Sequence, residues 1–132
     1  MEKKDIIFYG IGIAILIIAI WYFTQNKKAP SAPTSAFTVD LTNPTNAPLN
    51  SSGGTVATNG VNIVNTGSGF TALAQACTHQ GCPLAYNKSG NDFVCPCHGG
   101  TFDINGNVTQ GPPKIALQKF NVTQNGNILT IG

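Results

Sequence analysis

Apolar residues follow two different patterns along the chain. Residues 6–23 form one continuous run without a charged side chain, whereas from Phe37 onward short apolar or β-branched runs alternate with turn residues. Short runs bounded by turns, with no helical period, predict β-strands. We therefore expect an all-β body in residues 37–132, with strands at 37–41, 55–58, 61–65, 70–74, 92–94, 101–104, 115–122 and 128–131.

Turn signals separate these predicted strands. Asn-Gly pairs occur at residues 59–60, 105–106 and 125–126, and Asn-Gly is the strongest short hairpin signal because both residues tolerate a positive φ. The spacing of the turns, about 8–12 residues, suits a small antiparallel sandwich or barrel. The stretch Asn-Pro-Thr-Asn-Ala-Pro at 43–48 predicts an irregular surface loop.

The apolar run at 6–23 is long enough to cross a membrane as a helix. Its eighteen residues would span roughly 27 Å, close to the thickness of the hydrocarbon core. Trp21 and Tyr22 stand where an interfacial aromatic belt would lie, and a pair of lysines flanks each end. The alternative is a cleavable signal peptide, whose apolar core is usually shorter, about 7–15 residues. We expect residues 1–26 to form a retained transmembrane anchor.

Residues 27–36 connect this predicted anchor to the β-body. They read Lys-Lys-Ala-Pro-Ser-Ala-Pro-Thr-Ser-Ala. Two prolines among small polar residues predict a semi-extended tether with nothing to bury. Such a tether would let a head domain at 37–132 move relative to its anchor.

Composition and charge exclude some classes of function. The 132 residues allow one small domain, and only 9% of them are charged, about a third of the usual share. Three Asp and three Lys cancel within residues 37–132, so the body offers no basic face for a phosphate backbone. The 42% of hydrophobic residues argues against intrinsic disorder.

All four cysteines and both histidines fall in two short blocks. The first reads Cys-Thr-His-Gln-Gly-Cys at 77–82, and the second reads Cys-Pro-Cys-His-Gly-Gly at 95–100. The residues allow two disulfides with incidental histidines, but this leaves the histidines inside both blocks unexplained. They also allow a zinc site of two Cys and two His, with two Cys left over. The third possibility is a [2Fe–2S] cluster with two Cys on one iron and two His on the other.

The two blocks resemble the paired motifs of Rieske iron–sulfur proteins. The resemblance extends to Gly111, Pro112 and Pro113, which are similar to the proline loop that covers the cluster in that family. It implies a Rieske-type sandwich or barrel with a cluster-binding subdomain at about 75–113. By this resemblance the cluster ligands are Cys77, His79, Cys95 and His98. It also implies that Cys82 and Cys97 form a disulfide joining the two loops.

The same resemblance implies one-electron transfer in the iron–sulfur subunit of a quinol–cytochrome c oxidoreductase. His98 or His79 would accept a hydrogen bond and then a proton from the quinol. The partners would be a cytochrome b-type subunit and a c-type cytochrome or equivalent acceptor. A cluster with two thiolates and two neutral imidazoles is uncharged when oxidised, so it accepts an electron more readily than a four-thiolate cluster does.

Location and alternative roles follow from the same residues. A disulfide requires an oxidising compartment, so we expect a single-pass protein of the cytoplasmic membrane with its N-terminus inside and its Rieske domain on the periplasmic or extracellular side. One alternative role is a stand-alone membrane-anchored electron carrier for another oxidoreductase. A ferredoxin serving an oxygenase is a further alternative, against which the anchor and the extra cysteine pair argue.

Three positions depart from the family pattern. High-potential members carry Ser and Tyr, which donate hydrogen bonds to sulfur, where this chain has Gly100 and Phe102. Fewer donors stabilise the reduced cluster less, so we expect a low-potential centre suited to menaquinol. Phe102 is also expected to pack in the core. Gln80 replaces a Leu that quinol-oxidising members often carry at the docking tip.

Overall fold

The computed structural model describes residues 15–20 and 29–132. Residues 15–20 are helical and exposed, and the remainder of the predicted anchor lies outside the described residues. Among the described residues, no helix has both the length and the apolar character needed to span a membrane.

The body consists of three antiparallel sheets. Their strand orders are β1-β11-β10, β2-β3-β4-β9 and β5-β6-β7-β8. The elements are β1 (Phe37–Asp40), the 3-10 helix η1 (Pro44–Asn50), β2 (Thr55–Thr58), β3 (Val61–Asn65), β4 (Phe70–Ala74), β5 (Ala85–Asn87), β6 (Asp92–Val94), β7 (Thr101–Asp103), β8 (Val108–Gln110), β9 (Lys119–Phe120), β10 (Val122–Asn125) and β11 (Ile128–Ile131). The prediction of an all-β body is confirmed.

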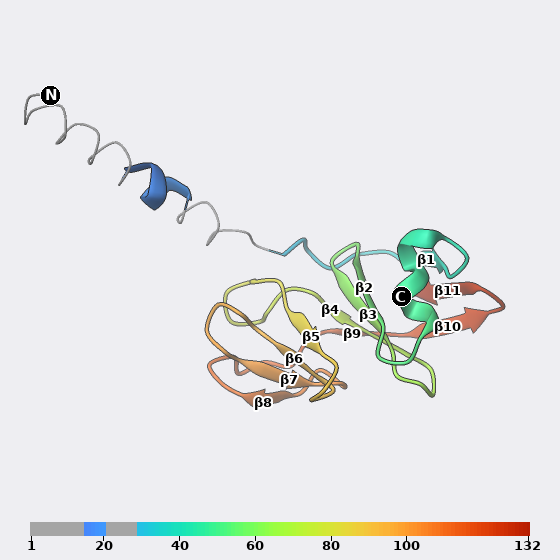
Figure 1. The fold of residues 1–132 in the computed structure, drawn as a ribbon. Coiled ribbons are helices and arrows are strands. Elements are labelled where there is room, and N and C mark those ends of the chain that lie inside the picture. Colours follow the sequence, from blue (N-terminus) through green and yellow to red (C-terminus); the bar gives the residue numbers. More distant parts are fainter. Residues whose placement is uncertain (1–14, 21–28) are drawn as a thin grey trace, which may run out of the picture.

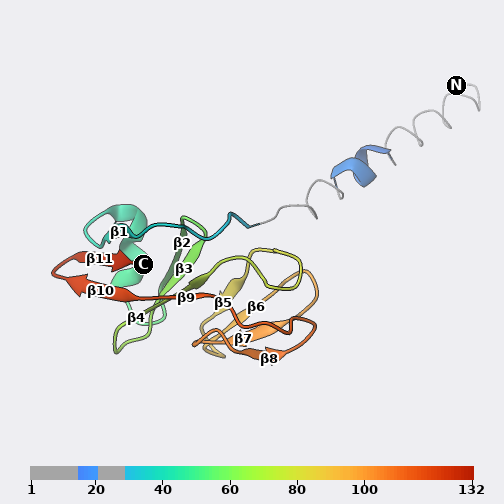
Figure 2. The same ribbon diagram turned by 180° about the vertical axis from the view of Figure 1, so that it is seen from behind.

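The sheets divide into two parts. The base comprises β1–β4 and β9–β11, and the insert comprises residues 75–118 with the sheet β5–β8. Figures 1 and 2 show β5–β8 gathered on one side of the molecule and β1, β10 and β11 on the other, with β2, β3, β4 and β9 between them. The insert begins and ends at neighbouring strands, because β4 pairs with β9 through Leu73 and Lys119.

The base forms where hydrophobic alternation and turn chemistry agree. Asn59 and Gly60 both have positive φ, 50° and 73°, and they close the hairpin between β2 and β3. In β11, exposed and buried residues alternate so that Leu129 and Ile131 enter the core. The buried base core consists of Val39, Leu41, Leu49, Val61, Ile63, Ala72, Phe120, Leu129 and Ile131.

Two predicted segments differ from the structure. The stretch 43–48, predicted as an irregular loop, mostly forms the 3-10 helix η1, where the Asn43 side chain accepts a hydrogen bond from the Thr45 amide at 3.0 Å. The strand predicted at 115–122 is wrong for its first half, because residues 115–118 form no strand; Ile115 is 69% exposed, while Leu117 is buried in the core of the insert.

The predicted tether also differs from expectation in the part that the structure describes. Ala29, Ala32 and Pro33 are half-buried, and Ala32 packs against the base core. The prediction that this stretch buries nothing is therefore wrong for Ala29, Ala32 and Pro33, whereas the other residues of 29–36 are exposed.

Candidate metal centre

The first cysteine block is a closed loop at the start of the insert. The amide of Cys77 donates to the carbonyl of Cys82 at 2.9 Å, and the amide of Gly81 donates to the carbonyl of Cys77 at 2.8 Å. Gly81 has a φ of +74°, a conformation that glycine adopts at little cost. The chain thus turns back on itself, and both cysteines lie at the neck of the loop.

The second block repeats this backbone pattern. The amide of Cys95 donates to the carbonyl of Gly100 at 2.8 Å, and the amide of Gly99, with a φ of +73°, donates to the carbonyl of Cys95 at 2.9 Å. The roles of Gly81 and Gly99 were not predicted from the sequence, although both blocks share the spacing Cys-x-x-x-Gly. The two cysteine blocks therefore have the same loop conformation, with the first cysteine of each at the base of its loop.

The thiols of Cys77 and Cys95 lie together beneath the surface. Their residues are 3% and 2% exposed. Burial raises the pKa of the Cys77 thiol, and the neighbouring Cys95 thiol raises it further, although hydrogen bonds from the backbone amides of His79 and Gln80 oppose the shift. These amides point at the sulfur atom, where they would stabilise a thiolate once a metal replaced the proton.

The two imidazoles form a second pair at the surface. His79 comes from the first block and His98 from the second, and both are exposed. Their ring centroids lie 5.0 Å apart with the rings perpendicular. Each loop therefore supplies one buried thiol and one exposed imidazole.

A disulfide joins the two loops. It connects Cys82 with Cys97 across fifteen residues of sequence, and this is the pairing that the resemblance implied. The sulfur atoms of Cys82, Cys95 and Cys97 lie within 4.8 Å of one another, but two of them are committed to the disulfide. The free cysteines are Cys77 and Cys95.

The proline loop lies against the second block. Gly111 and Pro112 are exposed, whereas Pro113 is buried. A side chain on Gly100 would place its Cβ 2.5 Å from Cδ of Pro113. The ring of Pro113 thus fills the space in which a serine at position 100 would lie.

The chain just after the proline loop is tied to the first block. The hydroxyl of Thr78 donates to the carbonyl of Ile115 at 2.7 Å. The proline loop thus lies against the second block, and the residues that follow it contact the first.

Phe102 lies beneath the site, in the core of the insert. Its side chain is fully buried, and it is paired with Phe93 across β6 and β7. The prediction that Phe102 packs in the core is confirmed. This second core consists of Val64, Leu73, Cys77, Cys82, Leu84, Phe93, Cys95, Phe102 and Leu117.

Known proteins share this arrangement of sequence and fold. Over 70 residues the chain is 42% identical to the carotenoid phi-ring synthase of Chlorobaculum tepidum. The aligned segment covers 53% of this chain and 11% of that protein. Over 57 residues it is 44% identical to the cytochrome b6-f complex iron-sulfur subunit of Prochlorococcus marinus strain MIT 9215. This alignment covers 42% of this chain and 32% of that subunit. The chain thus spans about a third or less of these two curated relatives.

A solved structure and a family model extend the comparison. The cyanobacterial plasma membrane Rieske protein PetC3 from Synechocystis PCC 6803 superposes with a TM-score of 0.53 at 34% identity, covering 59% of this chain and 83% of that chain. The model of the Rieske [2Fe-2S] domain matches residues 41–121, which is more than half of the chain. The chain therefore belongs to the Rieske [2Fe-2S] domain family, and its cofactor is a [2Fe–2S] cluster of the Rieske type.

Proposed function

We propose that Cys77 and Cys95 bind one iron of the cluster and that His79 and His98 bind the other. The observation that carries this proposal is the division of the six sulfur and imidazole side chains. Two cysteines are joined as a disulfide, two are free and buried, and the imidazoles lie side by side. Two thiolates and two imidazoles are the donor set of a Rieske cluster.

The surroundings of these donors fit the cluster. When bound, a [2Fe–2S] cluster supplies one-electron oxidation and reduction. The chain buries the sulfur donors, and backbone hydrogen bonds from His79 and Gln80 favour the thiolate form of Cys77 and so act to lower its pKa. Hydrogen bonds to sulfur and low exposure both tune the potential of such a centre. The exposed imidazoles keep the other end of the site open to a reaction partner.

We propose further that the chain is the iron–sulfur subunit of a quinol–cytochrome c oxidoreductase. Its resemblance to a cytochrome b6-f iron-sulfur subunit supports this role. An exposed imidazole can accept a hydrogen bond from a quinol hydroxyl through its outer ring nitrogen and then keep the proton. His98 or His79 would serve in this way. A cytochrome b-type subunit and a c-type cytochrome would be the partners.

The proposed location is the outer face of the cytoplasmic membrane. The support is the apolar run at residues 6–23, which we propose as the anchor, together with the disulfide in the body. Since disulfides persist in oxidising compartments, the N-terminus would lie inside and the body on the periplasmic or extracellular side.

We propose a low reduction potential, suited to menaquinol. Gly100 and Phe102 cannot donate hydrogen bonds from their side chains to sulfur, and Pro113 occupies the space beside Gly100. With fewer donors, the reduced state is less stabilised.

Extraction from native membranes in mild detergent, with this chain as the handle, tests the proposed role. We expect stoichiometric b-type haem in the reduced-minus-oxidised spectrum of the purified material. Iron–sulfur protein without any haem would contradict membership of a quinol-oxidising complex and would favour a stand-alone carrier.

A further inference from the structure

Residues 29–36, here called the strap, lie along the head instead of leaving it. The amide of Ala29 donates to the carbonyl of Gly81 at 2.8 Å. Gly81 belongs to the first cysteine block and directly precedes Cys82, which forms the disulfide. One end of the strap is thereby attached to the metal-binding loop.

A second contact is made by the next two residues of the strap, Pro30 and Ser31. Gly60, at the turn between β2 and β3, is buried, and a Cβ there would collide with the carbonyl of Ser31 and lie 2.9 Å from that of Pro30. Only the absence of a side chain at this turn allows the strap to lie so close.

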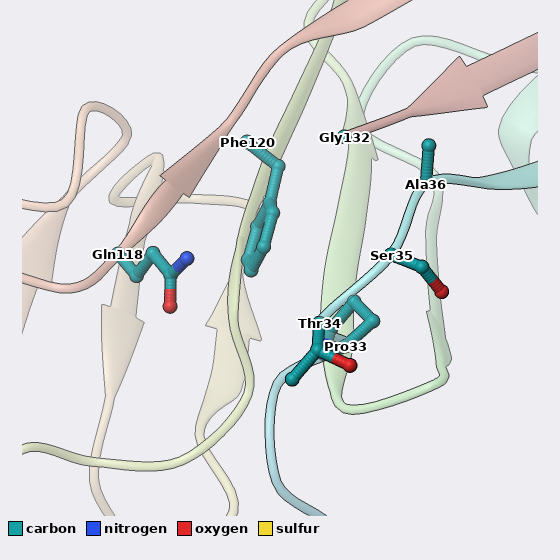
Figure 3. A pocket seen from close by; sticks show the side chains of 7 residues that line it. All are labelled: Pro33, Thr34, Ser35, Ala36, Gln118, Phe120 and Gly132. Carbon is teal, nitrogen blue, oxygen red and sulfur yellow. The ribbon is translucent and has the colours of Figure 1, made fainter.

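The far end of the strap reaches the end of β11. Ala36 packs against Gly132, where an added Cβ would lie 2.7 Å from the Cβ of Ala36. Between these contacts a groove of about 180 Å³ separates the strap from the base. Figure 3 shows Gln118 and Phe120 on one side of this groove and residues 33–36 on the other.

The strap is held by few interactions. The Ala29 amide makes the one hydrogen bond between strap and head among the described residues, and prolines at positions 30 and 33 have no N–H to donate. The strap forms no strand of the sheet. Its small half-buried side chains and the open groove permit it to detach while the strands beneath it stay paired.

We propose that the strap is a releasable part of the tether and sets how far the head can move. When it is docked, Ala29 is held beside the first cysteine block. When it is released, the tether gains eight residues, which extend to at most about 26–29 Å. The docking of the strap on the head is independent of the proposed function. The consequence for movement of the head rests on the proposal that the chain is an anchored electron carrier.

The docking point links the strap to the metal-binding loop. The carbonyl that holds the strap belongs to Gly81, whose own amide is held by the carbonyl of Cys77 at 2.8 Å. A change that loosens this loop also loosens the acceptor of the strap.

Gly60→Ala in the full chain tests the docking, and Gly126→Ala is its matched control. Both glycines have positive φ, +73° and +58°, so both alanines meet comparable backbone strain. A Cβ at Gly60 meets the strap, whereas a Cβ at Gly126 meets nothing within 4 Å. We expect Gly60→Ala to raise hydrogen exchange of the Ala29 amide, the one strap amide hydrogen-bonded to the head among the described residues, at least tenfold, and Gly126→Ala to leave it unchanged.

Equal exchange of the Ala29 amide in wild type and both variants would overturn the proposal. If Gly60→Ala does not fold, Ala29→Pro removes the donor without touching the base, and release is then read as faster limited proteolysis within residues 29–36 than in wild type; equal proteolysis would overturn the proposal. These measurements need no partner protein, so they stand even if no haem co-purifies. In an isolated complex, equal turnover of a released variant and the Gly126→Ala control would overturn the role of the strap in reach.

Discussion

The base and the insert are both antiparallel β-structures, but they are stabilised by different means. The base has strands of four and five residues apart from β9, and its core is made only of aliphatic and aromatic side chains. In the insert every strand has three residues, and three of the nine residues in its core are cysteines. The base therefore depends on hydrophobic burial alone, whereas the insert depends on hydrophobic burial together with its cysteines and their disulfide.

The way the chain connects the two parts makes the insert depend on the base more than the base depends on the insert. The insert begins after β4 and returns at β9, and these strands pair with each other in the base. If the base unfolds, the ends of the insert separate. If the insert opens, the base keeps its own sheets and its core, although Val64 of β3 and Leu73 of β4, which pack in the core of the insert, lose that contact. A destabilising substitution in the base should therefore affect both parts, whereas one in the insert should affect the insert alone.

The largest expected effect is that of Leu129→Ala in the base. Leu129 is fully buried, and removal of such a side chain costs about 2–5 kcal/mol of unfolding free energy. We expect faster hydrogen exchange in both base and insert, together with a lower denaturation midpoint. If exchange increased in the base alone, the insert would be an independent unit and the comparison would fail.

Removal of the disulfide is expected to act on the insert alone. A disulfide that closes a loop of this length, fifteen residues, contributes about 3 kcal/mol. In the variant Cys82→Ser with Cys97→Ser we expect faster exchange at the Cys95 and Gly99 amides, with Ile63 in β3 unchanged. A uniform acceleration through both parts would contradict the division.

Phe102→Tyr is expected to raise the reduction potential. A hydroxyl that donated to a cluster sulfur would contribute about 1 kcal/mol, or roughly 40 mV for one electron. Phe93→Tyr is the matched control, because Phe93 is equally buried and pairs with Phe102 across the sheet. A redox titration that gave the same potential for Phe102→Tyr and wild type would contradict the hydrogen-bond explanation. Gly100→Ser is a poorer test, since it displaces Pro113.

The smallest effect is expected from pH. Burial raises the pKa of Asp103, but hydrogen bonds from the side chain and backbone of Asn107 and from the amides of Asn105 and Gly106 outweigh it, so the pKa lies below the ordinary 3.8. A lowered carboxyl pKa contributes stability that is present above pH 3.8 and is lost as pH falls through the folded value. Asp103→Asn should flatten the acid limb of the unfolding curve between about pH 2 and 5, and an unchanged limb would contradict this.

The sequence was informative wherever a local pattern decides the structure. The Asn59-Gly60 turn and the alternation in β11 could be predicted because each follows from residues adjacent in the chain. Strands β5 and β8 could not be predicted, because neither forms a distinct apolar run. Their pairing depends on neighbouring strands and on the loops that the cysteines hold.

The site divides in the same way. The two motifs located all four cysteines and both histidines, since their spacing is a local property, and which of them bind the cluster stays a prediction. The roles of Gly81 and Gly99 were overlooked, although the repeated Cys-x-x-x-Gly spacing carried a signal. The docking of the strap could not be predicted, because it depends on Gly60 and Gly81, which are far from the strap in sequence.

The most direct test of the central claim is pulsed EPR of the reduced full-length protein labelled with ¹⁵N-histidine. The proposed ligands predict a one-electron-reduced [2Fe–2S] signal with nitrogen couplings from two imidazoles, and the loss of one coupling in His79→Cys, which offers a sulfur donor instead. A reduced cluster without histidine nitrogen couplings, or a metal-loaded protein without any EPR signal, would contradict the assignment of Cys77, Cys95, His79 and His98 as ligands.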